Sequence, residues 1–195
     1  MRRRVFILGL FFTSLGALEG CSESDLTVAS DAMKDAATDA FIPGVEGTPI
    51  VQGALWEAVT GVDDPFSELR GDAERCSVEP FQEEYGGVEI DTTDCKHVTL
   101  RQDGLAQVSR GSRIRVIAWH SQLYDPDTRS AFGYMSITLG DTALWSVERP
   151  IPGPASSWDF VVEATSDFEV GTPVYLHVRN HGANNWNLHS LTLVE

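Results

Sequence analysis

The residues most able to carry chemistry are five histidines, and three of them lie close together near the end of the sequence. His177, His181 and His189 form this trio, whereas His97 and His120 stand alone. Imidazole nitrogens are common ligands of zinc and copper, so the trio is a candidate metal site. Its spacing would bring His177 and His181 to one face only on a helix, and the segment has the pattern of a strand that runs into a turn. A metal-binding protein or metal-dependent enzyme that uses these histidines is therefore the alternative interpretation.

Other patterns typical of enzymes are weak in this sequence. There is no Gly-x-Ser-x-Gly elbow, and no cysteine stands beside a histidine as a nucleophile would. The acid pairs Asp63-Asp64 and Glu83-Glu84 could serve glycoside hydrolysis, but adjacent carboxylates on a strand point to opposite faces. The sequence does not decide whether the protein is an enzyme, and it favours a protein without catalytic activity.

Outward-pointing side chains offer a stronger candidate, a binding platform. In the segment 174–179, apolar residues alternate with Tyr175, His177 and Arg179, which must share the face away from the core. The same alternation turns Trp119 and Tyr134 outward from two other segments. If these strands are neighbours, the sheet presents aromatic rings and polar groups that suit a sugar or a peptide. With the loop that follows, the predicted ligand-binding residues are Trp119, Tyr134, Tyr175, His177, Arg179, Asn180, His181, Asn184 and Trp186.

Two simpler interpretations compete with these sites. Cross-strand aromatic residues often only stabilise a sheet, Asn and Gly are ordinary turn formers, and Trp186 could close one end of the fold. Four acids predicted to lie in loops could bind a structural Ca²⁺, since carboxylate oxygens are its preferred ligands. They are Asp63, Asp64, Asp125 and Asp127. Calcium is thus the first candidate cofactor, ahead of zinc or copper, and no cofactor is required by the pattern.

The elements that must position these residues are short strands. Apolar and polar residues alternate in runs separated by Gly, Pro, Asp and Asn, which is typical of an antiparallel β-sandwich. The predicted strands are 88–90, 98–100, 113–119, 134–139, 158–163, 174–179 and 191–193. One short helix is compatible with 65–75.

The end of the chain resembles a known fold family. The segments 171–182, 186–188 and 191–193 are similar to the closing hairpin of galactose-binding-like jelly rolls, with a "Gly-x-x-x-φ-x-φ" strand, a turn and a final "φ-x-φ" strand. The resemblance implies a β-sandwich of jelly-roll type that binds carbohydrate or another ligand without catalysis. The whole chain also resembles exported bacterial lipoproteins that carry one such domain.

The start of the chain has the pattern of an export signal. Arg2, Arg3 and Arg4 precede an apolar stretch, residues 5–18, that is too short for a stable membrane span. The residues Leu18-Glu19-Gly20-Cys21 resemble a bacterial lipobox, although Glu19 departs from its usual small residue. The resemblance implies cleavage after residue 20, acylation of Cys21 with palmitate-type chains, and, because Ser22 follows, an outer-membrane anchor. Whether the domain faces the periplasm or the cell surface stays open.

The rest of the chain divides into a linker and one domain. Residues 21–52 are acidic, with few large apolar side chains, which predicts a flexible linker. Residues 53–195 are long enough for one sandwich core. In an exported domain the two remaining cysteines, Cys76 and Cys95, are expected to form a disulfide.

Composition and charge narrow the function. The 195 residues are 42% apolar and 22% charged, which indicates a folded domain, and the net charge of −15 disfavours nucleic acid as a partner. We therefore expect a lipid-anchored β-sandwich that binds a glycan or peptide without catalysis. A purely structural component of the envelope is a further alternative.

Overall fold

The computed structural model describes residues 47–69, 79–125 and 131–195, all of which belong to one compact unit, Phe41–Glu195. Regular structure in these residues consists of strands and three short 3-10 turns, η1 (Gly53–Leu55), η2 (Gly61–Asp63) and η3 (Ser67–Leu69). No helix in the described ranges has the length and apolar character of a membrane span. The predicted signal, Cys21 and nearly all of the predicted linker lie outside the described residues.

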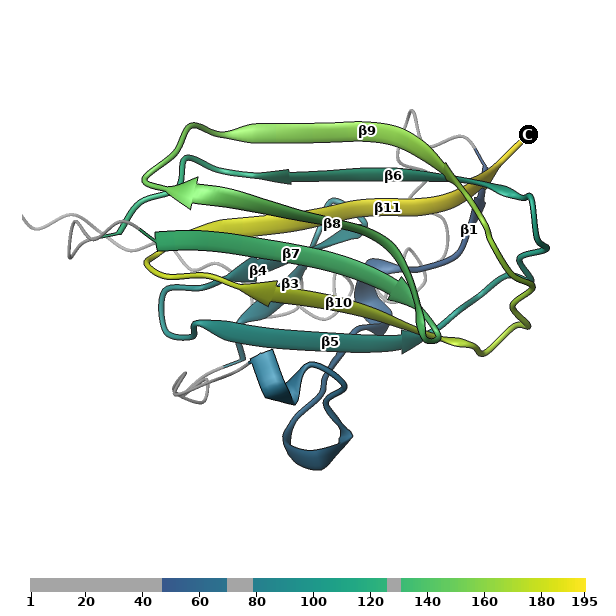
Figure 1. Ribbon diagram of the computed structural model, residues 1–195, viewed down its shortest axis with the longest axis horizontal. Helices are drawn as coiled ribbons and strands as arrows, with labels where there is room; N and C mark the ends of the chain where they lie inside the picture. Colours follow the sequence, from purple (N-terminus) through teal and green to yellow (C-terminus); the bar gives the residue numbers. More distant parts are fainter. Residues whose placement is uncertain (1–46, 70–78, 126–130) are drawn as a thin grey trace, which may run out of the picture. The chain divides into compact units, whose positions relative to one another are not determined.

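The strands form two antiparallel sheets, which we call sheet A and sheet B (Figure 1). Sheet A has the order β3 (Phe81–Glu84), β4 (Gly87–Asp91), β11 (Asn185–Val194), β6 (Arg113–His120) and β9 (Ser156–Glu163), with β1 (Thr48–Pro49) also paired to β11. Sheet B has the order β2 (Glu57–Ala58), β5 (His97–Asp103), β10 (Pro173–Arg179), β7 (Ala131–Leu139) and β8 (Thr142–Ile151).

The path of the chain is that of a jelly roll. From β4 onward it passes from sheet A to sheet B and back, so that β11, the last strand, lies in the middle of sheet A and β10 in the middle of sheet B. Strands distant in the sequence therefore become neighbours, such as β4 and β11. The predicted fold class, an antiparallel β-sandwich of jelly-roll type, is confirmed.

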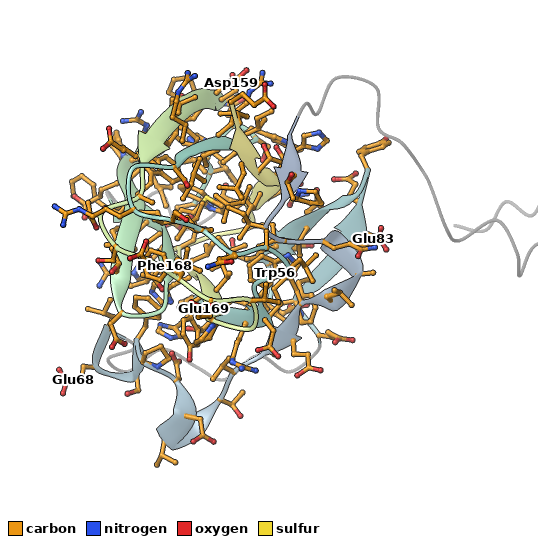
Figure 2. The ribbon with its side chains drawn as sticks, turned by 90° about the vertical axis from the view of Figure 1, so that its right-hand side faces the viewer. Trp56, Glu68, Glu83, Asp159, Phe168 and Glu169 are labelled. Carbon is orange, nitrogen blue, oxygen red and sulfur yellow. The ribbon has the colours of Figure 1, made fainter. Side chains whose placement is uncertain are left out.

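The core lies between the sheets and is built from alternate residues of each strand. Ile114, Val116 and Ala118 of β6 are fully buried, as are Val174 and Leu176 of β10. Figure 2 shows Trp56 among the side chains of the interior, whereas Glu68, Glu83 and Asp159 lie at the periphery of that view. The alternate residues that face away from this core form two outer faces, which we call face A and face B after their sheets.

Three features extend or qualify the sequence predictions for the domain. Strand β1 pairs with β11 and Ile50 is fully buried, so the sandwich begins before Gly53 and includes part of the predicted linker. Within the predicted helix 65–75, the structure describes only the short turn η3, and residues 70–78 lie outside the described ranges. Cys95 is buried and disulfide-bonded. Because Cys76 is not among the described residues, its pairing with Cys95 stays a prediction.

Candidate functional site

The predicted platform residues are divided between the two faces. Strands β7 and β10 are neighbours in sheet B, where Arg179 lies opposite Tyr134 and Tyr175 lies opposite Thr138. Trp119 belongs to β6, in sheet A, and so lies on the other side of the molecule's core. The structure therefore brings Tyr134, Tyr175, His177 and Arg179 together on face B and separates them from Trp119.

Face B is covered at its centre by residues 61–69, which we call the covering loop. Its Phe66 ring stacks on the imidazole of His177, with ring centroids 4.5 Å apart and an interplanar angle of 11°. Tyr175 meets the same phenyl ring edge-on at 6.5 Å. His177 is fully buried as a result, although its side chain points away from the sandwich core.

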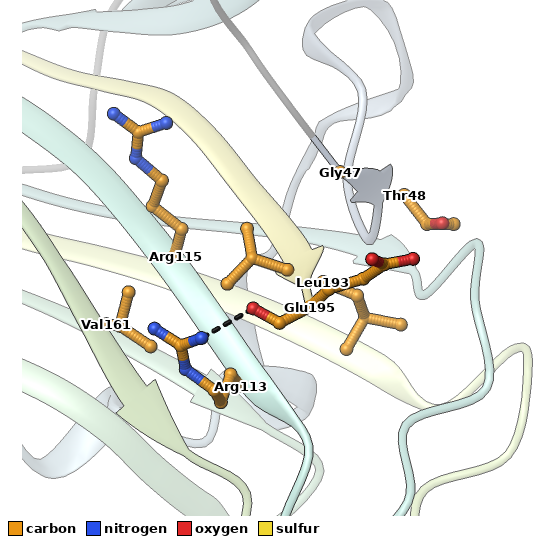
Figure 3. A pocket seen from close by; sticks show the side chains of 8 residues that line it. Gly47, Thr48, Arg113, Arg115, Val161, Leu193 and Glu195 are labelled. Carbon is orange, nitrogen blue, oxygen red and sulfur yellow. Dashed lines mark hydrogen bonds between the residues drawn. The ribbon is translucent and has the colours of Figure 1, made fainter.

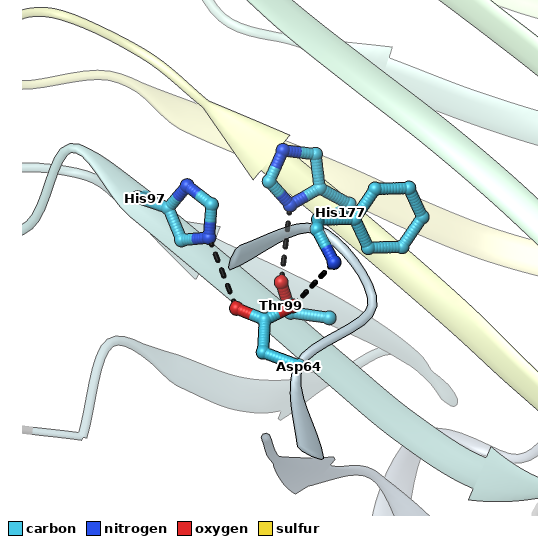
Figure 4. Close-up of polar contacts among 5 residues, drawn as sticks. Asp64, His97, Thr99 and His177 are labelled. Carbon is cyan, nitrogen blue, oxygen red and sulfur yellow. Dashed lines mark hydrogen bonds and ion pairs between the residues drawn. The ribbon is translucent and has the colours of Figure 1, made fainter. Parts of the chain in front are cut away.

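Polar contacts hold the covering loop in place (Figure 4). The Asp64 carboxylate lies 3.2 Å from His97 Nε2, and both side chains are almost completely buried. Beside this pair, the Thr99 hydroxyl lies 3.1 Å from His177 Nδ1. Burial alone would raise the pKa of Asp64, but the backbone N–H of Phe66, His97 and Thr99 together lower it, so the ionised form is favoured. The middle of face B is thus filled by the protein's own side chains.

The loop after β10 is part of the structural framework at one end of the sandwich. Asn180, Asn184 and Trp186 are each at most 1% exposed. The Trp186 indole donates to Asn180 Oδ1 at 3.2 Å, and Asn180 Nδ2 donates to the Thr92 hydroxyl at 2.8 Å. A side chain at Gly133 would collide with the Trp186 ring, which explains a glycine there in the middle of β7. Of the predicted loop residues, only His181 is exposed.

The candidate metal ligands do not converge. His177 is stacked under Phe66 on sheet B, His181 lies in the loop, and His189 lies at an irregularity of β11 in sheet A. Within residues 47–69, 79–125 and 131–195, no three His, Cys, Asp or Glu side chains are grouped as a metal site requires. Of the acids considered for calcium, Asp64 pairs with His97, Asp63 is exposed, Asp125 is buried, and Asp127 lies outside the described residues.

Face A carries a continuous row of polar and aromatic side chains across all five main strands. The strand registers place Glu89 opposite Asn187 and Asn187 opposite Trp119. The row continues in the same registers to both edges of the sheet and consists of Gln82, Glu89, Asn187, Trp119 and Ser157. Each of these residues alternates with a core residue, so all five side chains point outward.

The central strand of face A has buried polar groups without partners. Asn187, Ser190 and Thr192 are 4%, 7% and 2% exposed, and the Asn187 amide nitrogen and both hydroxyls make no hydrogen bond within the described part of the chain. A buried polar group without a partner costs roughly 1–3 kcal/mol. These atoms have almost no accessible surface, and the Ser136 hydroxyl of sheet B is another such group, so they do not by themselves mark a ligand site on face A.

The acidic end of the row has its own electrostatics. Gln82 Nε2 donates to Glu89 Oε1 at 3.3 Å. Glu84, two residues after Gln82 on the same face of β3, has a raised pKa because burial and the adjacent carboxyl group of Glu89 both disfavour its ionised form. The row therefore offers donors, acceptors and an aromatic ring within one strip.

A hollow adjoins the other end of face A, where β6 meets the end of β11 (Figure 3). It has a volume of about 630 Å³ and is lined by Arg113, Arg115, Val161, Leu193 and neighbouring residues. Both guanidinium groups already have partners: Arg115 forms two hydrogen bonds of 2.8 and 2.7 Å with Asp159, and Arg113 donates to the backbone carbonyl of Glu195. The charge of Arg115 is therefore compensated by Asp159.

Only Trp119 of this row was predicted as a binding residue. Alternation in β4 and β11 already turns Glu89 and Asn187 outward, because Val88, Ile90, Trp186 and Leu188 are core residues. That signal was present in the sequence. It did not reveal that these side chains stand in one line, since the line depends on registers between strands far apart in the chain.

Comparison with known proteins yields no family assignment. No protein-family profile matches the sequence, and no curated protein sequence matches it either. Among solved structures, a CBM4 module is 14% identical with a TM-score of 0.43, and the match covers 75% of this chain and 94% of that one. A CBM35 from Paenibacillus barcinonensis is 9% identical with a TM-score of 0.34 and coverages of 74% and 97%. An arabinose-bound MgGH51 α-L-arabinofuranosidase is 10% identical with a TM-score of 0.39, and this chain spans 25% of its length.

Proposed function

We propose that the domain is a non-catalytic carbohydrate-binding module and that face A holds the glycan. The row of Gln82, Glu89, Asn187, Trp119 and Ser157 is the observation that supports this proposal. An aromatic ring can stack on the apolar face of a sugar, while amide and carboxylate groups bind its hydroxyls. Trp119 supplies the ring, and Gln82 and Glu89 supply an amide and a carboxylate.

The dimensions of the row favour an extended ligand over a single small molecule. Adjacent strands lie about 4.8 Å apart, so a row across five strands is roughly 19 Å long. Trp119 lies opposite Asn187 near the middle of the row and would stack on one sugar ring. An oligosaccharide lying across the strands would meet the indole and the polar groups in turn.

Replacement of Trp119 tests the site directly. We expect W119A to weaken binding to oligosaccharides on a glycan array and in calorimetry at least about tenfold, because a central aromatic contact is lost. Its free energy of unfolding should change by less than about 1 kcal/mol, since the ring is on an outer face. Phe132→Ala is the matched control, because Phe132 is a ring 53% exposed on sheet B.

The outcomes of this test separate the two faces. Loss of binding in W119A with wild-type binding in F132A supports face A. Wild-type affinity in W119A, or an equal loss in F132A, contradicts the proposed site. A folded wild-type protein that binds no glycan on the array contradicts the proposed function and favours a structural role in the envelope.

We also propose that the domain is anchored to the outer membrane through acyl chains on Cys21. The lipobox-like residues Leu18-Glu19-Gly20-Cys21 support this proposal. Two acyl chains make a stable anchor, whereas one gives only reversible binding. Growth with labelled palmitate should label the wild-type protein in the membrane fraction and leave Cys21→Ser unlabelled. Equal labelling of both proteins would contradict the anchor.

A further inference from the structure

The main path of each sheet ends in two edge strands, and three of these four strands carry features that hinder pairing with another chain. Strands β2 and β3 are only two and four residues long. Strand β8 has ten residues, but it contains Pro150, places Arg149 over the Trp158 ring, and has an irregular register with β7. Short length, proline, an inward charge and a bulge all protect sheets against edge-to-edge association.

Strand β9, the fourth edge strand, has none of these features. Figure 1 shows it at the upper margin of sheet A. It pairs with β6 over all eight residues without a register shift, and it contains no proline, lysine or arginine. Its two charged residues are Asp159, whose carboxylate is held by Arg115, and Glu163, the last residue. Within the described part of the chain no strand pairs with its other side, so β9 is a long, regular edge that is open to another strand.

Hydrogen bonds at the end of β9 identify the backbone groups that face this open side. The Ala164 N–H donates to the Ser112 carbonyl at 2.9 Å, and the Ala164 carbonyl accepts from the Gly111 N–H at 2.8 Å. Both backbone groups of Ala164 therefore point toward the segment that leads into β6. Because this direction alternates along an antiparallel strand, the even-numbered residues of β9 bond to β6 and the odd-numbered ones point outward. The outward N–H and C=O groups are those of Ser157, Asp159, Val161 and Glu163.

Apolar side chains of β9 are only partly covered. Trp158, Phe160 and Val162 pack against the core but are half-buried. The Trp145 ring of β8 meets the rings of Trp158 and Phe160 at centroid distances of 5.1 and 5.4 Å. Val161, on face A, is 42% exposed. A strand added beside β9 would bury more of this apolar surface and stabilise the association.

We infer that β9 pairs in antiparallel orientation with β9 of a second copy of the chain, about a two-fold axis at Phe160. A two-fold interface requires a patch that is complementary to itself. In this register Phe160 lies opposite its own equivalent and Trp158 lies opposite Val162, so apolar residues meet apolar residues. On the outer face Asp159 lies opposite Val161, and no acid lies directly opposite another acid. This self-complementarity favours a second copy over an unrelated strand.

The pairing does not depend on the proposed function. Its two-fold axis is perpendicular to sheet A, so face A of both copies would lie on the same side of the dimer. A dimer would then present two copies of Trp119 to one glycan polymer and gain avidity, a consequence that rests on the proposed function. Failure of dimerisation would leave glycan binding by the single domain untouched.

Proline at Val161 tests the pairing. Val161→Pro removes an outward N–H and no hydrogen bond to β6, so the fold should be retained. Val161→Thr is the matched control, because it keeps the N–H and a β-branched side chain of similar size. In sedimentation velocity of the full-length protein in mild detergent, we expect a dimer for the wild type and V161T. The dissociation constant of the V161P dimer should be at least about tenfold higher.

A second proline variant guards against an effect on folding. Ser157→Pro removes another outward N–H, and it should weaken the dimer as V161P does. Circular dichroism and thermal unfolding establish that each variant is folded. A wild-type protein that stays monomeric would overturn the inference, and so would folded V161P and S157P proteins that dimerise like the wild type.

Cysteine cross-linking tests the register. Cβ atoms directly opposite each other in neighbouring strands are about 5 Å apart, so Phe160→Cys should form a disulfide-linked dimer under mild oxidation. Ser157→Cys is the matched control, because Ser157 lies opposite Glu163 and its two equivalents would be roughly 20 Å apart along the strands. Linkage of S157C as strong as that of F160C would overturn this pairing.

The salt dependence of the dimer gives a further test. Each copy has a net charge of −15, so the two copies repel each other at long range. Higher salt screens this repulsion and should lower the dissociation constant. Weaker association at high salt would show that ion pairs between the copies hold the dimer together, and it would overturn the backbone pairing.

Discussion

Face A and face B of the sandwich carry similar types of residue but differ in what covers them. On face B, the protein's own Phe66 covers His177, whose Nδ1 lies beside the Thr99 hydroxyl, and His97 is paired with Asp64. On face A, Asn187, Ser190 and Thr192 are buried polar side chains whose nitrogen or hydroxyl groups have no partners among the described residues. Face B also contains a buried polar group without a partner among the described residues, the Ser136 hydroxyl of β7. The two faces differ in the covering loop, which lies over face B, and we propose that face A takes the ligand.

This comparison shows why outward alternation alone does not identify a binding site. Tyr175 and Trp119 are both outward residues of central strands, yet only Tyr175 meets a ring of the covering loop. A ligand and a loop can fill the same kind of sheet surface with the same contacts. The two faces should therefore differ in what a mutation damages, stability on face B and affinity on face A.

The largest effect should come from the buried ion pair on face B. Asp64→Ala leaves His97 buried without its carboxylate, and removing one member of a buried pair costs about 3 kcal/mol or more. Urea denaturation should show this loss in the free energy of unfolding. The matched control is Asp159→Ala, which breaks an exposed ion pair with Arg115. It should leave the midpoint of urea denaturation nearly unchanged. Equal destabilisation by both variants would remove the contrast between the faces.

A smaller loss is expected from the ring of the covering loop. Phe66→Ala removes the ring stacked on His177 and should lower the free energy of unfolding by about 2 kcal/mol, less than for a residue of the central core because Phe66 is half-buried. Binding of the glycan should stay at its wild-type level. If F66A instead bound glycan less well, the ligand site would have to include face B.

Tyr175 provides the sharpest comparison with Trp119. Tyr175→Ala should cost about 1 kcal/mol of stability, because the ring loses its edge-on contact with Phe66, and should leave glycan affinity unchanged. Paired measurements on Y175A and W119A would thus give opposite patterns of stability and affinity. A tenfold loss of affinity in Y175A would place the ligand on the originally predicted platform.

The smallest expected difference is in the pH dependence of stability. The lowered pKa of Asp64 means that its ionised form stabilises the fold above the ordinary carboxyl pKa and that this stabilisation is lost as the pH falls through the lowered value. The difference in free energy of unfolding between the wild-type protein and Asp64→Asn should therefore disappear below about pH 4.

Glu84 should show the opposite dependence, because its pKa is raised: ionisation of Glu84 destabilises the fold as the pH rises through the raised value. Thermal unfolding of D64N and E84Q across acidic pH checks both signs, and parallel curves would contradict them.

The candidate site shows how far local patterns reach. Alternation correctly assigned Tyr134, Tyr175 and Trp119 to outer faces, but the condition that their strands are neighbours held only for β7 and β10. The burial of His177 could not be predicted, because it depends on Phe66, which lies far away in the sequence. Similarly, Asn180, Asn184 and Trp186 looked like loop residues available to a ligand, and tertiary contacts make them a buried network.

The sequence by itself determined the fold class and the face of each strand residue. Both depend on a period of two along the strand, which any single segment carries. The assignment of strands to sheets, the row across face A and the closure of face B were decided only by the tertiary structure. They depend on registers and contacts between segments such as β4 and β11, or residues 61–69 and β10, and no local pattern encodes a pairing over such a distance.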